Sequence, residues 1–445
     1  MRDWINDTPI VITEGRDCFI KDTYGRWYID GVSSMWVNIH GHARKEINAA
    51  LINQLSHISH STLLGLANEP SVEFAGKLVS LISEHLKTDK LNKVFYSDNG
   101  STAVEAALKM AFQYMQHTKK CADAVFVTLG NGYHGDTIGA VSAGGIDLFH
   151  KTYAPLLFKT IKAPSPYCFS CPDGILSDET DAPSKYRCTA DGEFPCLTKL
   201  RNILEHLTPN VAAVLIEPLI QAAGGMITAP VGYLKAVRNL CTKFDTLLIA
   251  DEVATGFGRT GTMFACEHEG VVPDILCLSK GITGGYLPLA VTIATEKVYN
   301  AFLGEFAEMK TFFNGHSYTG NQLGCAAALA SLEIFEKDNV LNNLKPKIKI
   351  LRDWLNSIFN HPHVSDVRVY GLMAGIELIK DKATMEPFQF EEKAGWQVAH
   401  EARKRSVFIR PLGNVLVIMP PLAISQENLS AMLIRIEKSI DAAFK

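Results

Sequence analysis

The sequence lacks the features that mark several classes of protein. Its 445 residues contain 43 Lys and Arg against 47 Asp and Glu, which gives a formal net charge of −4. Without a basic excess, the chain has no electrostatic footprint for DNA, RNA or an anionic membrane surface. It contains no run of roughly 18 uncharged apolar residues, and residues 1–7 hold no apolar segment of signal-peptide length. We therefore expect a soluble, cytoplasmic protein with no nucleic-acid or membrane partner.

Cysteine is also scarce, with ten residues in the whole chain, far below the density of a disulfide scaffold. Four of them fall in one short stretch: Cys168, Cys171, Cys188 and Cys196. The first two have the Cys-x-x-Cys spacing of half a zinc site, but the second pair is spaced too widely and no histidine lies nearby. We expect these cysteines to pack in a loop without metal. A zinc-dependent structural or binding protein is the non-enzyme alternative.

Apolar strand patterns alternate with amphipathic helix patterns through most of the chain. Residues 94–97 predict a strand that ends at an Asp-Asn-Gly turn, and apolar residues at helical spacing follow. The same alternation returns further along, with strands at 124–129, 211–216, 246–250 and 275–278, several of them continuously apolar. Such strands are covered on both faces, which predicts an α/β domain of three layers around a mainly parallel sheet. Its ligand is expected at the carboxyl ends of the strands.

The pattern changes at about residue 330, from where long helices surround short strands and indicate a smaller α+β domain. A strand near 25–29 and a helix near 46–58 are expected to pack with it. We therefore predict a large ligand-binding domain at 61–330 and a small domain built from 1–60 and 331–445. Residues 164–195, rich in Pro, Asp, Cys and Gly, are expected to form an excursion from the sheet.

Two charged residues come directly after apolar strands of the predicted sheet. Asp251 either caps the turn that follows it or keeps a cationic ligand atom protonated. Lys280 follows the strand at 275–278 and precedes a glycine-containing segment. Desolvation there lowers the pKa of an ammonium group and exposes a nucleophilic amine, which Schiff-base chemistry requires.

A phosphate site is predicted where Gly100 and Ser101 lead into a helix, because free N–H groups and a hydroxyl would face an anion at a positive helix end. A capping box of Thr102 and Glu105 would explain this segment without a ligand, and the two interpretations are compatible. Tyr133, after another strand, either packs in the protein or stacks on an aromatic cofactor. Together with Asp251 and Lys280, these are the parts of a pyridoxal phosphate site.

One motif points to a different cofactor. The glycines at 256, 258 and 261 satisfy the G-x-G-x-x-G pattern of dinucleotide sites, which is typical of dehydrogenases. The first glycine, however, comes five residues after Asp251 instead of directly after a strand, and the segment that follows is a poor helix start. We therefore do not expect a nicotinamide cofactor.

Two motifs resemble the signature of the class III pyridoxal-phosphate aminotransferases of fold type I. They are Ile-Ala-Asp-Glu-Val-Ala-Thr-Gly-Phe-Gly-Arg-Thr-Gly at 249–261 and Leu-Ser-Lys-Gly-Ile-Thr-Gly-Gly at 278–285, and the resemblance covers nearly the whole chain. Within this class, further stretches resemble most the 8-amino-7-oxononanoate aminotransferases of biotin synthesis. They are similar to a Bacillus-like branch, described as using lysine where other members use S-adenosylmethionine. These stretches are 33–42, 60–65, 131–137, 311–321 and 409–413.

The resemblance implies a role for each matching residue. Lys280 would bind pyridoxal 5'-phosphate covalently, Asp251 would hold the pyridine nitrogen, and Tyr133 would stack on the ring. The phosphate would be bound by Gly100 and Ser101 and, from the second subunit of a homodimer with shared active sites, by His316 and Ser317. Besides Tyr133 and Lys280, the substrate-contact positions would be Met35, Trp36, Gly315 and Arg410.

The implied reaction is a ping-pong transamination between a small-molecule amino donor and a keto acceptor, with Arg410 suited to clamp the acceptor's carboxylate. The chain departs from the family pattern in two places. Family members commonly begin with a Trp-x-Pro-Phe-Thr-Gln-like segment that contributes to the substrate pocket, and this chain starts just after it. Met35 also replaces the aromatic residue of members that use S-adenosylmethionine, which favours another donor.

Other activities of the same fold remain as alternatives. The main one is another class III ω-amino acid or diamine aminotransferase, and an aminomutase or decarboxylase comes after it. The ornithine and acetylornithine enzymes of this class carry an arginine shortly before a Pro-Pro pair, where this chain has Val-Ile-Met-Pro-Pro at 417–421. That difference argues against an α-carboxylate site of the ornithine type.

Overall fold

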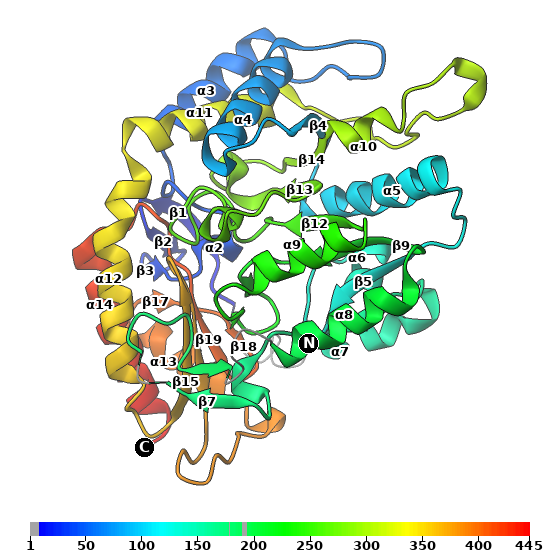
Figure 1. The fold of residues 1–445 in the computed structure, drawn as a ribbon. Helices are drawn as coiled ribbons and strands as arrows, with labels where there is room; N and C mark the ends of the chain where they lie inside the picture. Colours follow the sequence, from blue (N-terminus) through cyan, green and yellow to red (C-terminus); the bar gives the residue numbers. More distant parts are fainter. Residues whose placement is uncertain (1–8, 178, 189–193) are drawn as a thin grey trace.

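The computed structural model describes residues 9–177, 179–188 and 194–445 (Figure 1). Within them, a seven-stranded sheet has the order β4-β14-β13-β12-β9-β5-β6. β14 is antiparallel to both of its neighbours, whereas the other adjacent strands are parallel. The sheet is therefore mainly parallel, as predicted. Its strands are β4 (Leu91–Ser97), β5 (Val125–Leu129), β6 (Ile161–Ala163), β9 (Val211–Ile216), β12 (Leu247–Asp251), β13 (Ile275–Leu278) and β14 (Ala290–Thr295).

Helices cover both faces of this sheet. Every residue of β12 is buried, and alternate side chains point to opposite faces. Leu248 and Ala250 belong to the hydrophobic cluster that includes residues of α4, α8 and α9, whereas Leu247 and Ile249 belong to the cluster that includes residues of α5. The three-layer arrangement is confirmed. These helices are α4 (Glu69–Leu86), α5 (Gly100–Lys119), α8 (Pro195–Leu207) and α9 (Tyr233–Lys243).

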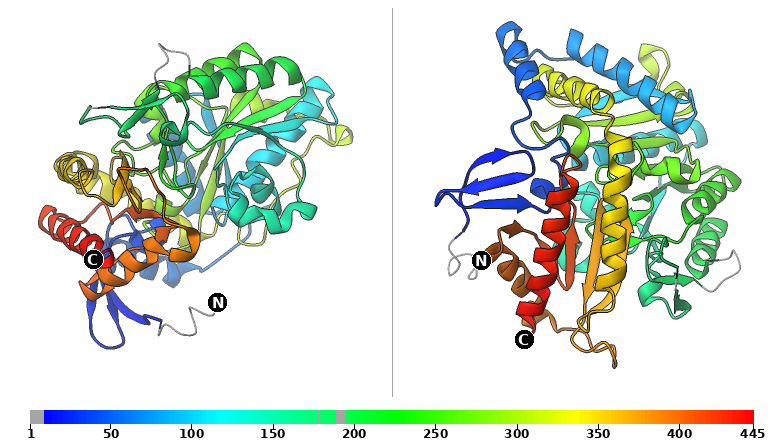
Figure 2. Two further views of the ribbon diagram at one scale, coloured as in Figure 1. Left: turned by 90° about the horizontal axis from the view of Figure 1, so that it is seen from below. Right: turned by 90° about the vertical axis from the view of Figure 1, so that its left-hand side faces the viewer.

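Two smaller sheets lie beside the large one. The sheet β15-β16-β19-β18 is antiparallel, and the sheet β1-β2-β3-β17 joins the two ends of the chain through the parallel pair of β3 and β17. Figures 1 and 2 show the N-terminal strands in blue beside the C-terminal segments in orange and red. The strands are β1 (Ile12–Arg16), β2 (Phe19–Asp22), β3 (Trp27–Asp30), β15 (Val364–Tyr370), β16 (Met373–Leu378), β17 (Val407–Phe408), β18 (Pro411–Leu412) and β19 (Val415–Ile418).

The remaining long helices are α3 (Lys45–His57), α11 (Gln322–Lys337), α12 (Val340–Ile358), α13 (Ala394–Lys404) and α14 (Gln426–Ala443). α11 crosses residue 330, so the proposed domain boundary falls inside a helix, and the domain limits stay a prediction. The excursion contains a hairpin of β7 (Gly174–Leu176) and β8 (Tyr186–Cys188), and the segment between these strands makes an isolated antiparallel bridge from Ser184 to Arg368 of β15. No helix among the described residues is long and apolar enough to cross a bilayer. The expectation about a signal peptide concerns residues 1–7, which lie outside the described residues.

Candidate active site

A cavity of about 680 Å³ lies at the carboxyl ends of the sheet strands, where parallel α/β sheets bind their ligands. Its walls include residues that follow β4, β5, β9, β12 and β13. The strand order explains how they meet. In the register of the sheet, Ala250 of β12 pairs with Ile216 of β9, and Asp251 pairs with Cys277 of β13. The residues that continue these neighbouring strands therefore share one edge: Glu217, Asp251 and Lys280.

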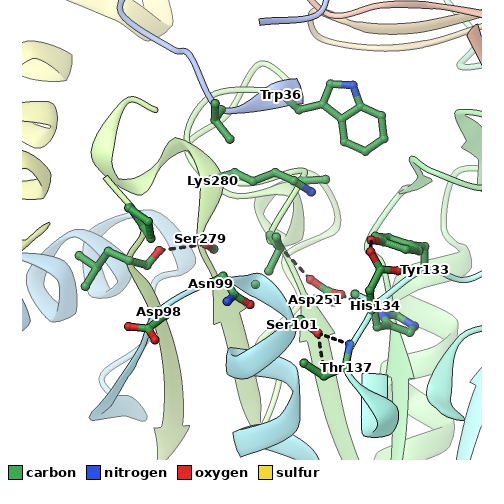
Figure 3. Close-up of a pocket in the computed structure, with 18 of the residues that line it drawn as sticks. Trp36, Asp98, Asn99, Ser101, Tyr133, His134, Thr137, Asp251, Ser279 and Lys280 are labelled. Atoms are coloured by element: carbon green, nitrogen blue, oxygen red, sulfur yellow. Dashed lines mark hydrogen bonds and ion pairs between the residues drawn. The ribbon is translucent and has the colours of Figure 1, made fainter. Parts of the chain in front are cut away.

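Lys280 extends into this cavity between the ring of Trp36 and Asp251 (Figure 3). Its ammonium nitrogen lies 5.0 Å from the centroid of the Trp36 ring. Burial lowers the pKa of Lys280, while the negative charges of Asp251 and Glu217 oppose that lowering. The amine is therefore more often neutral, and nucleophilic, than a lysine in water.

Asp251 is only 4% exposed, so its charge needs partners. Its Oδ2 atom lies 2.7 Å from Nδ1 of His134, and its Oδ1 atom accepts the Val253 N–H at 3.1 Å. His134 is itself buried and lines the cavity. We did not single out His134 from the sequence, although it follows the predicted stacking residue Tyr133 directly.

Glu217 is a second buried carboxyl group in the same wall, and the sequence interpretation missed it. Its two oxygens accept the N–H groups of Tyr133 and Ala222, each at 3.0 Å. Burial, together with the nearby charge of Asp251, raises the pKa of Glu217 to about 7, against the opposing effect of His134. The available signal was its position directly after the apolar segment 211–216.

The predicted phosphate site lies where β4 leads into α5. The Asn99 side chain accepts the Thr102 N–H at 3.1 Å, and the Thr102 hydroxyl accepts the Asn99 N–H at the same distance. The capping box of this helix is therefore formed by Asn99 and Thr102, and not by Thr102 and Glu105 as in the alternative interpretation of the sequence. Glu105 instead accepts the Gly139 N–H at 2.7 Å and so ties α5 to the segment after Tyr133.

Ser101 is held by that same neighbouring segment. Its hydroxyl lies 2.7 Å from the Thr137 hydroxyl and also accepts the Thr137 N–H at 3.1 Å. A Cβ atom on Gly100 would come within 2.4 Å of Val253 Cγ1. The first turn of α5 therefore needs glycine there and presents both backbone N–H groups and a hydroxyl to the cavity.

Tyr133 lies in the cavity wall with part of its ring exposed. Its hydroxyl donates to Asp136 at 2.9 Å, and the ring meets Phe149 edge-on with centroids 6.2 Å apart. Burial raises the pKa of Tyr133, so this hydroxyl stays protonated and acts as a donor.

Five predicted residues, Met35, Gly315, His316, Ser317 and Arg410, are absent from the cavity wall. Four of them have a contact that fixes their place. Arg410 Nη1 lies 3.3 Å from the Met35 sulfur, and His316 Nδ1 lies 3.4 Å from the carboxylate of Asp98, a cavity residue of the same chain. The Ser317 carbonyl accepts a hydrogen bond from His60.

All ten cysteines are free thiols. Cys168 is buried in the short helix η2 (Cys168–Ser170), and Cys188 ends β8. In the described part of the chain, no three His, Cys, Asp or Glu side chains come together as a metal site would require. The G-x-G-x-x-G segment lies in turns between β12 and the short helix η3 (Ala265–Glu269), so it lacks the strand-to-helix context of a dinucleotide site.

Known proteins with similar sequences and structures identify the family. Residues 2–440 match the family described as aminotransferase class-III. The adenosylmethionine-8-amino-7-oxononanoate aminotransferase of Geobacter sulfurreducens is 53% identical over 99% of this chain and 94% of that protein. The structure of the protein with the same name from Methanocaldococcus jannaschii has a TM-score of 0.90 and 43% identity, with 99% of this chain and 95% of that chain covered.

A third structure extends the similarity to a cofactor-bound protein. It is an amine transaminase from an uncultivated Pseudomonas species in a PLP-bound form, with a TM-score of 0.87 and 32% identity over 99% of this chain and 96% of that chain. The predictions of family, fold and cofactor are confirmed. The chain belongs to the class III aminotransferases and is a fold type I transferase that depends on pyridoxal 5'-phosphate.

Proposed function

We propose that the chain transfers an amino group to the C7 ketone of 8-amino-7-oxononanoate and so forms 7,8-diaminononanoate in biotin biosynthesis. The observation that carries this proposal is the 53% identity, over 99% of the chain, to a protein with that substrate in its name. The stretches that resembled this group of enzymes in the sequence include residues of the cavity wall, Trp36 and Tyr133 among them.

The cavity suits a cofactor with a phosphate, an aldehyde and a pyridine nitrogen. At one end, Gly100 and Ser101 would hold the phosphate with N–H groups and a hydroxyl at a positive helix end. Deeper in the cavity, Asp251 would pair with the pyridine nitrogen. Lys280 would bind the aldehyde carbon, and the ring of Tyr133 would cover the cofactor.

When bound, pyridoxal phosphate supplies a carbon that exchanges amines and a protonated ring that withdraws electrons from the substrate. Lys280 would move the proton at the substrate carbon, first as a base and then as an acid, because its lowered pKa favours the neutral amine. Asp251 would keep the ring nitrogen protonated. His134 would hold that carboxylate in place through the 2.7 Å contact.

The keto acid would lie between Lys280 and the cavity mouth. Arg410 is exposed beside Met35, and its guanidinium would pair with the carboxylate of the acceptor. Trp36 would pack on the alkyl chain. No atom lies closer than 4.0 Å to the position of a Cβ on Gly315, so this residue leaves room for the substrate.

We further propose a homodimer in which His316 and Ser317 of each subunit complete the phosphate site of the other. Two features support it. Large apolar side chains are exposed near this segment, including Phe313 at 73%, Tyr318 at 61% and Leu64 at 75%. Exposed apolar residues in such a group are typical of a protein interface. The Nε2 atom of His316 is also buried without a hydrogen-bond partner.

The proposed amino donor is L-lysine, because Met35 stands where members that use S-adenosylmethionine carry an aromatic residue. S-Adenosylmethionine is the second candidate, favoured by the names of the Geobacter and Methanocaldococcus relatives. Either donor would supply one amino group to the cofactor, so the residues assigned above would serve both of them.

A donor panel tests the substrate and the donor together. The holoenzyme is incubated with 8-amino-7-oxononanoate and with lysine, S-adenosylmethionine or a simple ω-amine, and 7,8-diaminononanoate is measured by mass spectrometry. We expect product with lysine and none with Lys280→Ala. Failure of every donor with this ketone, with transamination of other ketones intact, would replace the proposal with another ω-amino acid or diamine aminotransferase.

A further inference from the structure

The turn that carries Trp36 into the cavity wall has an unusual backbone conformation. Four consecutive residues other than glycine have positive φ angles: Ser33 (50°), Ser34 (49°), Met35 (69°) and Trp36 (72°). In this left-handed region, the Cβ atom of an L residue crowds the following carbonyl oxygen, so such residues normally occur singly. A run of four needs contacts from outside the turn to hold it.

The buried carboxylate of Asp30 holds the first half of the turn. Asp30 is 0% exposed. Its Oδ1 atom accepts the Ser34 N–H at 2.9 Å, and its Oδ2 atom accepts the Ser34 hydroxyl at 2.8 Å. The ring of His42 lies 3.0 Å from Oδ2 and fixes the carboxylate from the other side.

Further contacts hold the two ends of the turn. The Ser33 hydroxyl donates to the Met419 carbonyl at 2.5 Å, and the Val37 N–H donates back to the Ser33 carbonyl at 3.1 Å. The buried guanidinium of Arg259 donates to the Trp36 carbonyl at 3.3 Å. Among the described residues, however, only Asp30 binds both the backbone N–H and the side chain of a residue in the middle of the turn.

The turn presents two side chains to the proposed substrate. The Trp36 ring lies over the Lys280 ammonium group, with the nitrogen 5.0 Å from its centroid. Met35 is 45% exposed and contacts Arg410. A right-handed or extended backbone at these residues would point both side chains in other directions.

We propose that Asp30 is a positioning residue for the keto acceptor: it holds residues 33–36 left-handed, so that Trp36 faces Lys280 in the cavity wall and Met35 lies against Arg410 outside that wall. The proposal rests on the proposed function only in taking this cavity as the place where the acceptor binds. Asp30 itself need not touch substrate or cofactor.

The test uses holoenzyme variants and separates KM from kcat. We expect Asp30→Ala to raise KM for the keto acceptor at least about tenfold, with kcat within about threefold of the wild type, because the reacting groups stay in place. The affinity of the keto acid for the borohydride-reduced holoenzyme, measured by calorimetry, is expected to fall by the same factor. This second readout does not depend on turnover.

Rescue by glycine distinguishes positioning from a general structural role. Glycine adopts positive φ without strain, so Asp30→Ala with Ser34→Gly should recover most of the lost affinity, whereas Asp30→Ala with Ser34→Ala should not. If Asp30→Ala does not fold, Asp30→Asn replaces it, because asparagine keeps one acceptor oxygen. Ser34→Gly and Ser34→Ala are then each combined with Asp30→Asn, and the two double variants are compared. Unchanged KM in the single variant, or equal recovery by alanine and glycine, overturns the proposal.

Asp22→Ala is the matched control. Asp22 is a buried carboxylate of the same sheet that also holds a turn, through the N–H groups of Tyr24 and Arg26, each at 2.9 Å. It should lower stability without changing KM, and an equal rise in KM would count against a specific role of Asp30. If the wild type rejects 8-amino-7-oxononanoate, the proposed function fails. The ratio of KM between each variant and the wild type, measured with a ketone that the wild type accepts, would still decide the role of Asp30.

Discussion

Lys280, Asp251 and Glu217 share one wall of the cavity, and their neighbours influence how each is charged. Burial lowers the pKa of Lys280 and raises that of Glu217 to about 7. Asp251 has the closest partner of the three, the ring of His134 at 2.7 Å. A neutral Glu217 beside it reduces the repulsion between two carboxyl groups in a poorly solvated place.

Replacement of His134 should therefore disturb Asp251 first. In His134→Leu the buried carboxylate loses its closest partner, and we expect the free energy of unfolding to fall by about 3 kcal/mol, as is usual for a broken buried pair. Cofactor affinity, measured by absorbance titration of the apoenzyme, should fall at least about tenfold. His268→Leu removes a histidine that bonds the Thr260 carbonyl instead. If it weakened cofactor binding equally, the effect would not be specific to His134.

Two buried glutamates predict how stability varies with pH. Burial raises the pKa of Glu217 and of Glu252 to about 7, whereas an unfolded glutamate titrates near 4.5. Between these values the folded protein binds more protons than the unfolded chain, so the stabilisation present at low pH is lost as pH rises toward 7. Each group contributes on the order of 3 kcal/mol to this loss.

Denaturant unfolding of the apoenzyme from pH 4.5 to 8 measures this effect. The slope between pH 5 and 7 should become less negative in Glu217→Gln and again in Glu252→Gln, because glutamine does not titrate. Only Glu217 lines the cavity, so only its variant should change the pH dependence of cofactor binding. A wild-type slope retained in both variants would contradict the assignment.

At the scale of helices and strands, the start of α5 combines close packing with the proposed phosphate site. Gly100→Ala would place a methyl group 2.4 Å from Val253 Cγ1, and we expect cofactor affinity to drop at least about tenfold because the first turn must shift. In the double variant Gly100→Ala with Val253→Ala, the shorter side chain at 253 leaves room for the added methyl group. Much of the cofactor affinity should therefore return. Absorbance titration measures both.

Gly76→Ala in α4 is the control for this substitution, because no atom lies within 4 Å of its added Cβ. Alanine in that open helix position should raise stability by about 0.5 to 1 kcal/mol and leave cofactor affinity unchanged. A loss of affinity there, or no rescue by Val253→Ala, would argue against the steric explanation.

The elements of the large sheet show how far sequence patterns reach. The bounds of β9, β12 and β13 were predicted within a residue or two, because short and almost wholly apolar runs are typical of strands that are buried on both faces. β14 was not identified, although it is buried throughout and pairs with β4, nearly two hundred residues earlier in the chain. The alternative capping box of Thr102 and Glu105 does not form at α5, because Ser/Thr/Asn spacing allows more than one capping box and only backbone geometry chooses between them.

At the scale of the whole molecule, the proposed shared active site predicts complementation. Lys280→Ala removes the amine of a subunit's own site. A double alanine variant at His316 and Ser317 removes the side chains that a subunit would contribute to the phosphate site of its partner. Mixed subunits should recover about a quarter of wild-type activity, because half of the dimers are mixed and one site in each is intact. Activity no higher than that of either parent would contradict sharing.

The sequence by itself determined the chemistry and the class of fold. Asp251 and Lys280 stand out because a charge at the end of a buried apolar strand is costly unless it has a partner. Local sequence patterns are enough to identify both residues. Only the tertiary structure could decide what surrounds them. Glu217 and His134 join the site because neighbouring strands end at one edge, and Asp30 matters because it bonds a left-handed turn. Such contacts depend on strand order, register and φ angles, which packing of the whole chain sets and no local pattern encodes.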